Sequence, residues 1–343
     1  MNKWIIVFGF LLACHLPDGQ PTQKPVLPGA YLLSEYIPKL ESKRIGLVVN
    51  HSSLVSKTHL VDTLIRLNMQ VAKVFTPEHG FTGTASDGEQ VEYRDDYRPF
   101  ELISLYGKNK KPTQQQLEGL DVMVFDIQDV GTRFYTYIST MHLVMEACAE
   151  RGLPLLILDR PNPNGSYVDG PVLDTAHRSF VGMHPIPIVH GMTVGELSLM
   201  INGEGWLGGQ LRCDLEVVPV KNWDHQMPYY LPVRPSPNLP DDLSISLYPS
   251  LCLFEGTLLS VGRGTDFAFQ QIGHPEYPDR DYSFTPLSRE GAKWPPYENE
   301  TCYGRSWIGQ TPSYSFTIAP LIDAYHKMNK RKDFFTNYFT KLA

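Results

Sequence analysis

The chain is poor in cysteine, and its cysteines do not stand at metal-binding spacings. The 343 residues contain five cysteines, with no CxxC pair and no HxxEH arrangement. Both absences disfavour a structural zinc site. Cys148 falls on the apolar face of an expected helix and is interpreted as a packed thiol. Cys213, Cys252 and Cys302 allow one disulfide, but the sequence does not say which pair would form it.

A block of like charge is also missing. The net charge of −7 is spread along the chain without a block of like charge, whereas nucleic-acid-binding proteins carry a basic patch or stripe. Nucleic acid is therefore not an expected partner. The chain also lacks GxGxxG, GxxxxGK[ST] and GxSxG motifs. Their absence disfavours a dinucleotide cofactor, P-loop chemistry and a serine hydrolase of that type, and we expect no cofactor.

The apolar run at the N-terminus is too short to span a bilayer. Lys3 precedes residues 4–12, a run with the length of a signal-peptide core. The sequence Leu-Leu-Ala-Cys that ends at Cys14 resembles a bacterial lipobox, in which the cysteine thiol is acylated. An ordinary secretion signal is the alternative. We expect residues 1–14 to be a lipoprotein signal peptide and residues 15–40 a tether. The exported chain would then be anchored to a bacterial membrane by lipid alone, facing the periplasm or the cell exterior.

Apolar strands alternate with amphipathic helices in the following part of the chain. The helix around Met141 is the clearest, because its apolar side chains recur three and four residues apart and Gly152 stands at its end. A capping box from Thr113 to Gln116 predicts another helix. Continuous apolar strands are typical of a parallel sheet that is buried on both faces. The predicted fold is therefore α/β: a Rossmann-like, mostly parallel sheet with helices on both faces. The expected strands are residues 44–50, 71–75, 102–106, 122–126 and 154–158.

The composition of the sequence changes after about residue 182. A second capping box, Thr193 to Glu196, predicts a helix, and residues 215–220 predict a strand. Pro-rich segments and the loop VGRGTDF follow. We expect a larger domain over residues 41–182 and a smaller α/β domain over residues 183–343, whose loops return to the site of the larger one.

Polar side chains directly follow four of the expected strands. The carboxyl ends of parallel strands share one edge of the sheet, where open α/β sheets bind ligands. In FTPEHGFTG, Pro77 fixes the entry to a turn and two glycines relax it, so that Glu78 and His79 are presented together as an acid/base pair. A solvated loop is the alternative. The four clusters are Asn50-His51, Glu78-His79, Asp126 to Asp129 and Asp159 to Asn162.

Rings and planar amides near these loops suit a carbohydrate better than a bare phosphate. Tyr135 is the expected ring contact, because the helix register turns Phe134 to the core. In the GRGT loop, Arg263 is expected to pair with a carboxylate, unless the loop is only a tight turn. A metal site built from histidines and aspartates is the weaker alternative, since those residues lack ligand spacing. The expected substrate-binding residues are Asn50, Gln128, Arg133, Tyr135, Arg160, Asn162, Asn238, Arg263 and Thr265.

Six motifs in one order resemble the exo-β-N-acetylmuramidase family, and the resemblance covers almost everything after residue 40. It implies a Rossmann-like domain, a smaller C-terminal domain, and an active site between them that releases N-acetylmuramic acid from the non-reducing end of peptidoglycan fragments. The proposed catalytic glutamate of the family corresponds to Glu78. Val261 departs from the SEGRGT of many members, which also continue into a further helical segment beyond Ala343. The motifs are FTPEHGFTG, FDIQDVGTRFYTYISTM, LDRPNPNG, HGMTVGEL, RPSPNLP and GRGT.

This resemblance and the residue pattern together suggest a mechanism. Glu78 would protonate the glycosidic oxygen, with its pKa raised by burial, and His79 would position it. Asp126 would act as nucleophile or base, or the acetamido group of the sugar would attack instead. Arg133, Arg160 and Arg263 are the candidates to bind the lactyl carboxylate of muramic acid.

Two other kinds of protein remain possible at this point. One is a lipid-anchored protein that binds a muropeptide or sugar without turnover, and the other is a metal-dependent hydrolase. The expected partners are MurNAc-GlcNAc saccharides derived from peptidoglycan, with no obligate protein partner.

Overall fold

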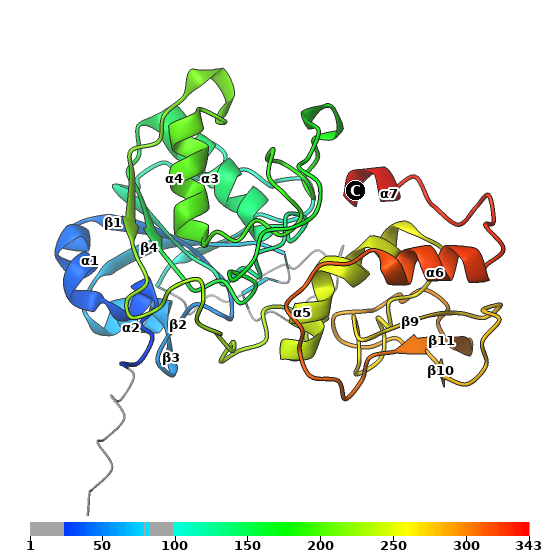
Figure 1. Cartoon of the computed structure of the whole chain (residues 1–343). Coiled ribbons are helices and arrows are strands. Elements are labelled where there is room, and N and C mark those ends of the chain that lie inside the picture. Colours follow the sequence, from blue (N-terminus) through cyan, green and yellow to red (C-terminus); the bar gives the residue numbers. More distant parts are fainter. Residues whose placement is uncertain (1–23, 79, 82–98, 343) are drawn as a thin grey trace, which may run out of the picture.

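A six-stranded parallel sheet forms the centre of the larger lobe (Figure 1). The structure is a computed structural model that describes residues 24–78, 80–81 and 99–342. The sheet has the order β5-β4-β1-β6-β7-β8, which in chain order is 3-2-1-4-5-6, the order of the Rossmann fold. The predicted fold class is confirmed. The strands are β1 (Arg44–Val49), β4 (Gln70–Thr76), β5 (Glu101–Ser104), β6 (Val122–Asp126), β7 (Leu155–Leu158) and β8 (Leu215–Val218).

Helices cover both faces of this sheet (Figure 1). Side chains alternate along each strand, so the strands contribute to two separate cores. Ile45 and Leu47 of β1 pack with α1 and α2, whereas Val48 packs with α3 and α4. Because both faces are buried, the strands read as continuous apolar runs. The helices are α1 (Leu33–Leu40), α2 (Leu60–Arg66), α3 (Tyr137–Arg151) and α4 (Val194–Glu204).

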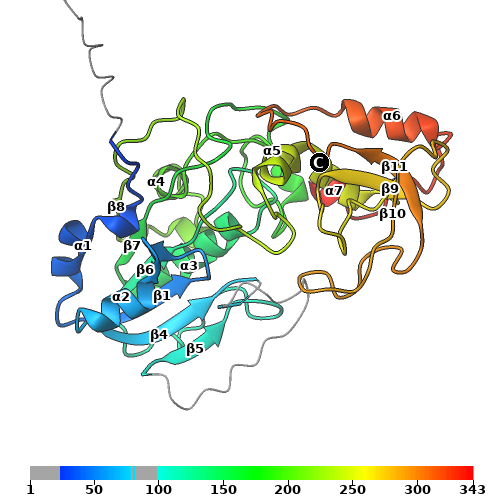
Figure 2. The same cartoon turned by 90° about the horizontal axis from the view of Figure 1, so that it is seen from below.

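A smaller lobe with a three-stranded antiparallel sheet lies beside the large sheet, and α5 lies between the two sheets (Figure 2). Its strand order is β10-β11-β9. A short hairpin, β2 (Leu54–Val55) with β3 (Thr58–His59), follows β1 in the larger lobe. The elements of the smaller lobe are α5 (Asp242–Leu251), the 3-10 turn η4 (Cys252–Gly256), β9 (Gln271–His274), β10 (Ser283–Phe284), β11 (Cys302–Ser306), α6 (Ala319–Lys327) and α7 (Phe339–Leu342).

The last part of the expected tether, residues 15–40, is folded onto the larger lobe. A 3-10 turn, η1 (Gly29–Tyr31), and α1 occupy the last part of that range. Tyr36 and Leu40 are fully buried on the sheet. The expected tether is therefore wrong from Gly29 onward, because α1 carries an apolar face that covers the sheet.

The expected boundary between residues 182 and 183 cuts through the larger lobe. β8 pairs in parallel with β7, with Leu155 opposite Leu215 and Leu158 opposite Val218. The predicted helix after Thr193 is confirmed as α4, with both bonds of its capping box present. Both elements therefore belong with the large sheet, since a strand–helix–strand unit of this kind completes it.

The capping box at Thr113 forms, but no helix directly follows it in the chain. The Thr113 N–H donates to Gln116 Oε1 at 2.8 Å, and the Gln116 N–H donates to Thr113 Oγ1 at 3.2 Å. The segment nevertheless remains a turn. Gly119, with φ +79°, ends it before enough residues have accumulated to offset the cost of helix nucleation.

All four cysteines in the described part of the chain are free and buried. They are Cys148, Cys213, Cys252 and Cys302, so none of the pairings left open by the sequence is formed. Over the same residues, no helix has both the length and the apolar character needed to cross a membrane. Cys14 lies outside the described residues.

Candidate active site

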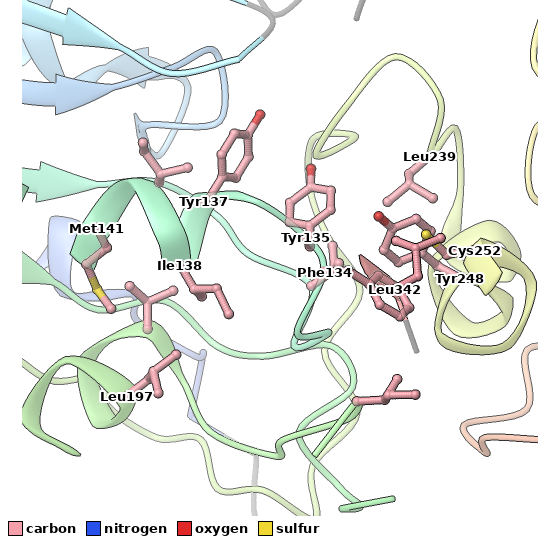
Figure 3. Close-up of a cluster of buried hydrophobic side chains, with 14 of the residues drawn as sticks. Phe134, Tyr135, Tyr137, Ile138, Met141, Leu197, Leu239, Tyr248, Cys252 and Leu342 are labelled. Atoms are coloured by element: carbon pink, nitrogen blue, oxygen red, sulfur yellow. The ribbon is translucent and has the colours of Figure 1, made fainter. Parts of the chain in front are cut away.

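Residues from both lobes line one cavity of about 620 Å³. The larger lobe contributes the turn after β4, the segment after β5 and the start of α3. The smaller lobe contributes α5, η4, the loop around Arg263 and the region of α7. Figure 3 shows Tyr135 and Tyr137 on the α3 side and Tyr248, Cys252 and Leu342 across from them. The volume suits a small molecule such as a sugar, for which sites of about 300–1,000 Å³ are typical.

Glu78 enters this cavity from the end of β4. Pro77 ends the strand, and the Gly80 N–H closes the turn by donating to the Pro77 carbonyl at 3.1 Å. Gly80 has φ +69°, a conformation that glycine adopts without strain. Thr136 Oγ1 donates to Glu78 Oε2 at 3.0 Å. The half-buried carboxyl is therefore held at the start of α3.

Buried tyrosines form the wall beside Glu78. The ring of Tyr135 packs edge-on against Tyr137, with centroids 4.9 Å apart, and against Tyr248 at 5.8 Å. Burial, and then the negative charge of Glu78, raises the pKa of Tyr137, so this side chain stays a neutral hydroxyl. The wall thus offers apolar ring surface, against which a sugar ring can pack.

A second carboxylate, Glu255, lies on the opposite wall, in η4. Its Oε1 accepts a bond from Arg263 Nε at 2.6 Å, and both side chains are about four-fifths buried. The Cys252 thiol lies 3.4 Å from Glu255 Oε2 and donates to it. Burial raises the pKa of this thiol, which keeps it protonated. Glu255 therefore has a cationic partner, whereas Glu78 has a neutral one.

Tyr338 lines the cavity that Glu78 and Glu255 also line. Burial raises the pKa of its hydroxyl first, followed by the negative charge of Glu255. Glu78 contributes in the same direction. The cavity thus holds a carboxyl group from each lobe.

Two family models match the chain. The model described as exo-beta-N-acetylmuramidase NamZ, N-terminal, matches residues 45–243, and the corresponding C-terminal model matches residues 246–342. The chain belongs to the exo-β-N-acetylmuramidase NamZ family. The family that the six motifs indicated is therefore confirmed.

Known members of the NamZ family and solved structures agree with this assignment. The peptidoglycan beta-N-acetylmuramidase NamZ of Bacillus subtilis (strain 168) is 43% identical over 284 residues, which are 79% of this chain and 68% of that protein. A crystal structure of a DUF1343 family protein from Bacteroides fragilis is 46% identical, with a TM-score of 0.86 over 93% of this chain and 88% of that one. A second one is 29% identical, with a TM-score of 0.74 over 89% and 83%. The expected enzyme class, a glycoside hydrolase, is confirmed.

Four of the predicted site residues line the cavity of this NamZ-family chain: Glu78, Tyr135, Asn238 and Arg263. Tyr135 also donates its hydroxyl to the Pro235 carbonyl at 3.0 Å. Asn238 Nδ2 donates to the Gly291 carbonyl at 2.8 Å. His79 lies outside the described residues.

Asp126 and Arg160 pair with each other instead of lining the cavity. Arg160 Nε lies 2.5 Å from Asp126 Oδ1, and Arg160 Nη2 lies 2.9 Å from Oδ2. Both side chains are buried, Asp126 completely. A buried carboxylate in a two-point ion pair is held for structural reasons and is shielded from a ligand. We therefore assign neither residue to the reaction, which corrects the expected roles of both.

Arg133 is likewise occupied by the protein. Its Nη1 donates to the carbonyls of Pro171 at 2.7 Å and Ile186 at 3.0 Å, and its Nη2 donates to Leu342 O at 3.2 Å. Burial lowers its pKa to about 10. Because its guanidinium donates to three carbonyl groups, we do not assign Arg133 the expected role of binding a substrate carboxylate.

The remaining predicted binding residues stabilise turns. Asn50 Oδ1 accepts the Ser52 N–H, and Asn162 Oδ1 accepts the Asn164 N–H. Gln128 Nε2 donates to the carbonyls of Asp129 and Pro161. Thr265 Oγ1 donates to the Gly262 carbonyl. Their hydrogen bonds fix the edge of the sheet and the GRGT turn, and none of the four lines the cavity.

Glu255 was not predicted from the sequence. A single acidic residue interrupts the apolar run of residues 251–256, eight residues before Arg263. That pattern predicts an ion pair once the GRGT loop is known to turn back. In the part of the chain that the structure describes, no three histidine, cysteine, aspartate or glutamate side chains gather as metal ligands.

Proposed function

We propose that this chain is an exo-acting β-N-acetylmuramidase that releases N-acetylmuramic acid from the non-reducing end of peptidoglycan fragments. The observation that carries the proposal is the pair Glu78 and Glu255, one from each lobe, on the wall of a single sugar-sized cavity. Most glycoside hydrolases act through such a pair of carboxyl groups. The name of the Bacillus subtilis relative supports the same substrate.

Glu78 is the proposed general acid. The Thr136 hydroxyl occupies Oε2, so the proton sits on Oε1 and is given to the glycosidic oxygen as the bond from that oxygen to C1 breaks. The ring then acquires oxocarbenium character, and the departing sugar leaves as a neutral alcohol. His79, the next residue, is proposed to position this group.

Glu255 is the proposed anionic partner. Arg263 and the Cys252 thiol orient its two oxygens, and a carboxylate in this place stabilises positive charge at C1. It would attack C1, activate a water, or orient the acetamido group of the sugar for attack. Retention through a covalent intermediate requires a separation of about 5–5.5 Å between the carboxyl groups, and inversion requires about 6.5–9.5 Å.

A chromogenic N-acetylmuraminide tests the proposed activity directly. We expect turnover by the purified chain that survives a chelator, and we expect Glu78→Gln to lose release of N-acetylmuramic acid from a MurNAc-GlcNAc disaccharide, whose leaving group needs a proton. Loss of turnover with chelator would instead indicate a metal-dependent hydrolase. Binding of the sugar without turnover would indicate a binding protein and contradict the proposal. Release of N-acetylmuramic acid from a MurNAc-GlcNAc saccharide would then establish the exo mode.

We also propose that the chain is exported and anchored to a bacterial membrane through an acylated Cys14, facing the periplasm or the exterior. The lipobox-like sequence before Cys14 supports this, and the anchor would keep the enzyme close to the cell wall. Labelled palmitate should be incorporated into the wild-type chain and not into Cys14→Ser. Equal labelling of both would contradict the proposal.

A further inference from the structure

Recognition of muramic acid requires a cation that is free to meet its lactyl carboxylate. The lactyl ether distinguishes muramic acid from N-acetylglucosamine, which carries a hydroxyl group at C3 in its place. Taking a carboxylate from water into a cavity is unfavourable unless a positive group receives it. Among the described residues that line the cavity, the cations are Lys110, Arg263 and Lys341.

The partners of these cations differ. Arg263 is bound to Glu255. Lys341 belongs to an exposed part of α7, and its ammonium lies 6.0 Å from the centroid of the Tyr338 ring, at the limit of a cation–π contact. Lys110 is half-buried, and its ammonium lies 3.8 Å above the centroid of the Phe180 ring. No carboxylate of the described residues pairs with Lys110. Of the three cations it is therefore the one that is both held in place, by Phe180, and free to bind a ligand carboxylate.

We propose that Lys110 is the residue that selects muramic acid, by binding the carboxylate of its lactyl group. This inference rests on the proposed function, and it adds the residue that discriminates between the two sugars. The ring of Phe180 holds the ammonium inside the cavity before a ligand arrives, so little side-chain freedom is lost on binding.

The surroundings of Lys110 fit the rest of the lactyl group as well. Phe180 and Val181 line the same cavity and are partly buried, so they offer apolar surface to the lactyl methyl group. Val181 packs against the main hydrophobic core, which fixes its position. A carboxylate and a methyl group on one carbon thus meet a cation and an apolar wall on one side of the cavity.

Lysine variants of the full-length chain test this inference. Lys110→Met removes the charge and keeps the stem, Lys110→Arg keeps a charge, and Lys108→Met is a matched control because Lys108 is exposed and does not line the cavity. Calorimetry measures the Kd of each protein for free N-acetylmuramic acid and for N-acetylglucosamine. The kcat/KM values for the corresponding 4-methylumbelliferyl β-glycosides provide a second readout.

Lys110→Met should weaken N-acetylmuramic acid binding and kcat/KM by about tenfold to a hundredfold, the usual effect of losing a hydrogen bond to a charged group. The values for N-acetylglucosamine should stay within about twofold. Lys110→Arg should restore part of the preference, and Lys108→Met should behave as wild type.

An unchanged preference in Lys110→Met would overturn the inference, as would an equal loss for both sugars. Loss of preference in Lys341→Met alone would assign the role to Lys341 and overturn it too. If wild type bound N-acetylmuramic acid but hydrolysed neither glycoside, the proposed activity would fail while binding still tested Lys110. If wild type bound neither sugar, both would fail.

Discussion

A single hydroxyl group holds the carboxyl of Glu78 in place. Thr136 Oγ1 donates to Glu78 Oε2 from the position just before α3. Thr136→Val removes the donor and keeps the shape of the side chain. On a disaccharide substrate we expect kcat to fall by about tenfold with little change in KM, because the lost bond would strengthen as the carboxyl gives up its proton and becomes charged. Thr136→Ser should retain most activity. A Thr136→Val enzyme with unchanged kcat would show that this bond does not position the acid.

Two buried histidines should make stability depend on pH. His142 Nδ1 lies 3.0 Å from His184 Nε2, and the carboxylate of Glu146 only partly offsets the effect of burial on the pKa of His142. Burial, reinforced by His142 and Arg178, lowers the pKa of His184 to about 2. Burial and Arg178 lower the pKa of His142 to about 4. Both rings are therefore neutral in the folded chain near neutral pH.

The direction of the pH effect follows from the unfolded value of about 6.5. Below that pH the unfolded chain binds protons that the folded chain does not, so the contribution of neutral His184 is complete above pH 6.5 and is lost as the pH falls. The difference in unfolding free energy between wild type and His184→Asn should shrink by about 1.4 kcal/mol per pH unit from pH 6 to pH 4. Urea unfolding measures it, with exposed His177→Asn as the control. A difference that stays constant would contradict the assignment.

At the scale of elements, the polar ends of β6 and β7 are joined by Asp126 and Arg160. Asp126→Asn leaves the Arg160 guanidinium buried without its anion, which should lower the unfolding free energy by about 3–5 kcal/mol. The double variant Asp126→Leu/Arg160→Met, which places apolar groups at both positions, should recover most of this loss and retain turnover. Urea denaturation and the muraminide assay measure both. An Asp126→Asn chain that keeps its stability and loses all turnover would instead make Asp126 catalytic.

The sequence predicted the elements well where one strong local signal decided them. The strands β1, β6 and β7 read as apolar runs because each is buried on both faces, and the end of α3 follows from Gly152 in its left-handed conformation. The capping box at Thr113 misled because its two hydrogen bonds also stabilise a turn. α1 was missed because its apolar face is short and Pro38 lies inside it.

The orientation of side chains at the strand ends was harder to predict. Placing Glu78 and Asp126 on one edge of the sheet follows from strand order. Which of them reaches the cavity depends on Arg160, which lies 34 residues beyond Asp126 and takes up its carboxylate. The role of Glu255 depends in the same way on the turn that returns Arg263 to it. The pairing of Asp126 with Arg160 leaves no local pattern, and the pattern around Glu255 becomes readable only once the turn before Arg263 is known.

At the scale of the whole molecule, the cavity that holds the proposed catalytic pair is lined by both lobes. The larger lobe supplies Glu78 and Lys110, the smaller lobe supplies Glu255 and Arg263, and both lobes contribute to the wall around them. The distinct partners of the two glutamates suggest distinct roles in the reaction. Replacement of Glu78 and replacement of Glu255 should therefore lower kcat/KM to different extents on substrates with different leaving groups.

The most direct measurement compares kcat/KM of Glu78→Gln and Glu255→Gln on two muraminides, one with an activated phenol as leaving group and one with a sugar. An activated phenol departs without a proton, so Glu78→Gln should lose about a hundredfold to ten-thousandfold on the disaccharide and far less on the phenyl glycoside. Glu255→Gln should lose activity on both alike. Equal losses on both substrates for Glu78→Gln would contradict its role as the acid.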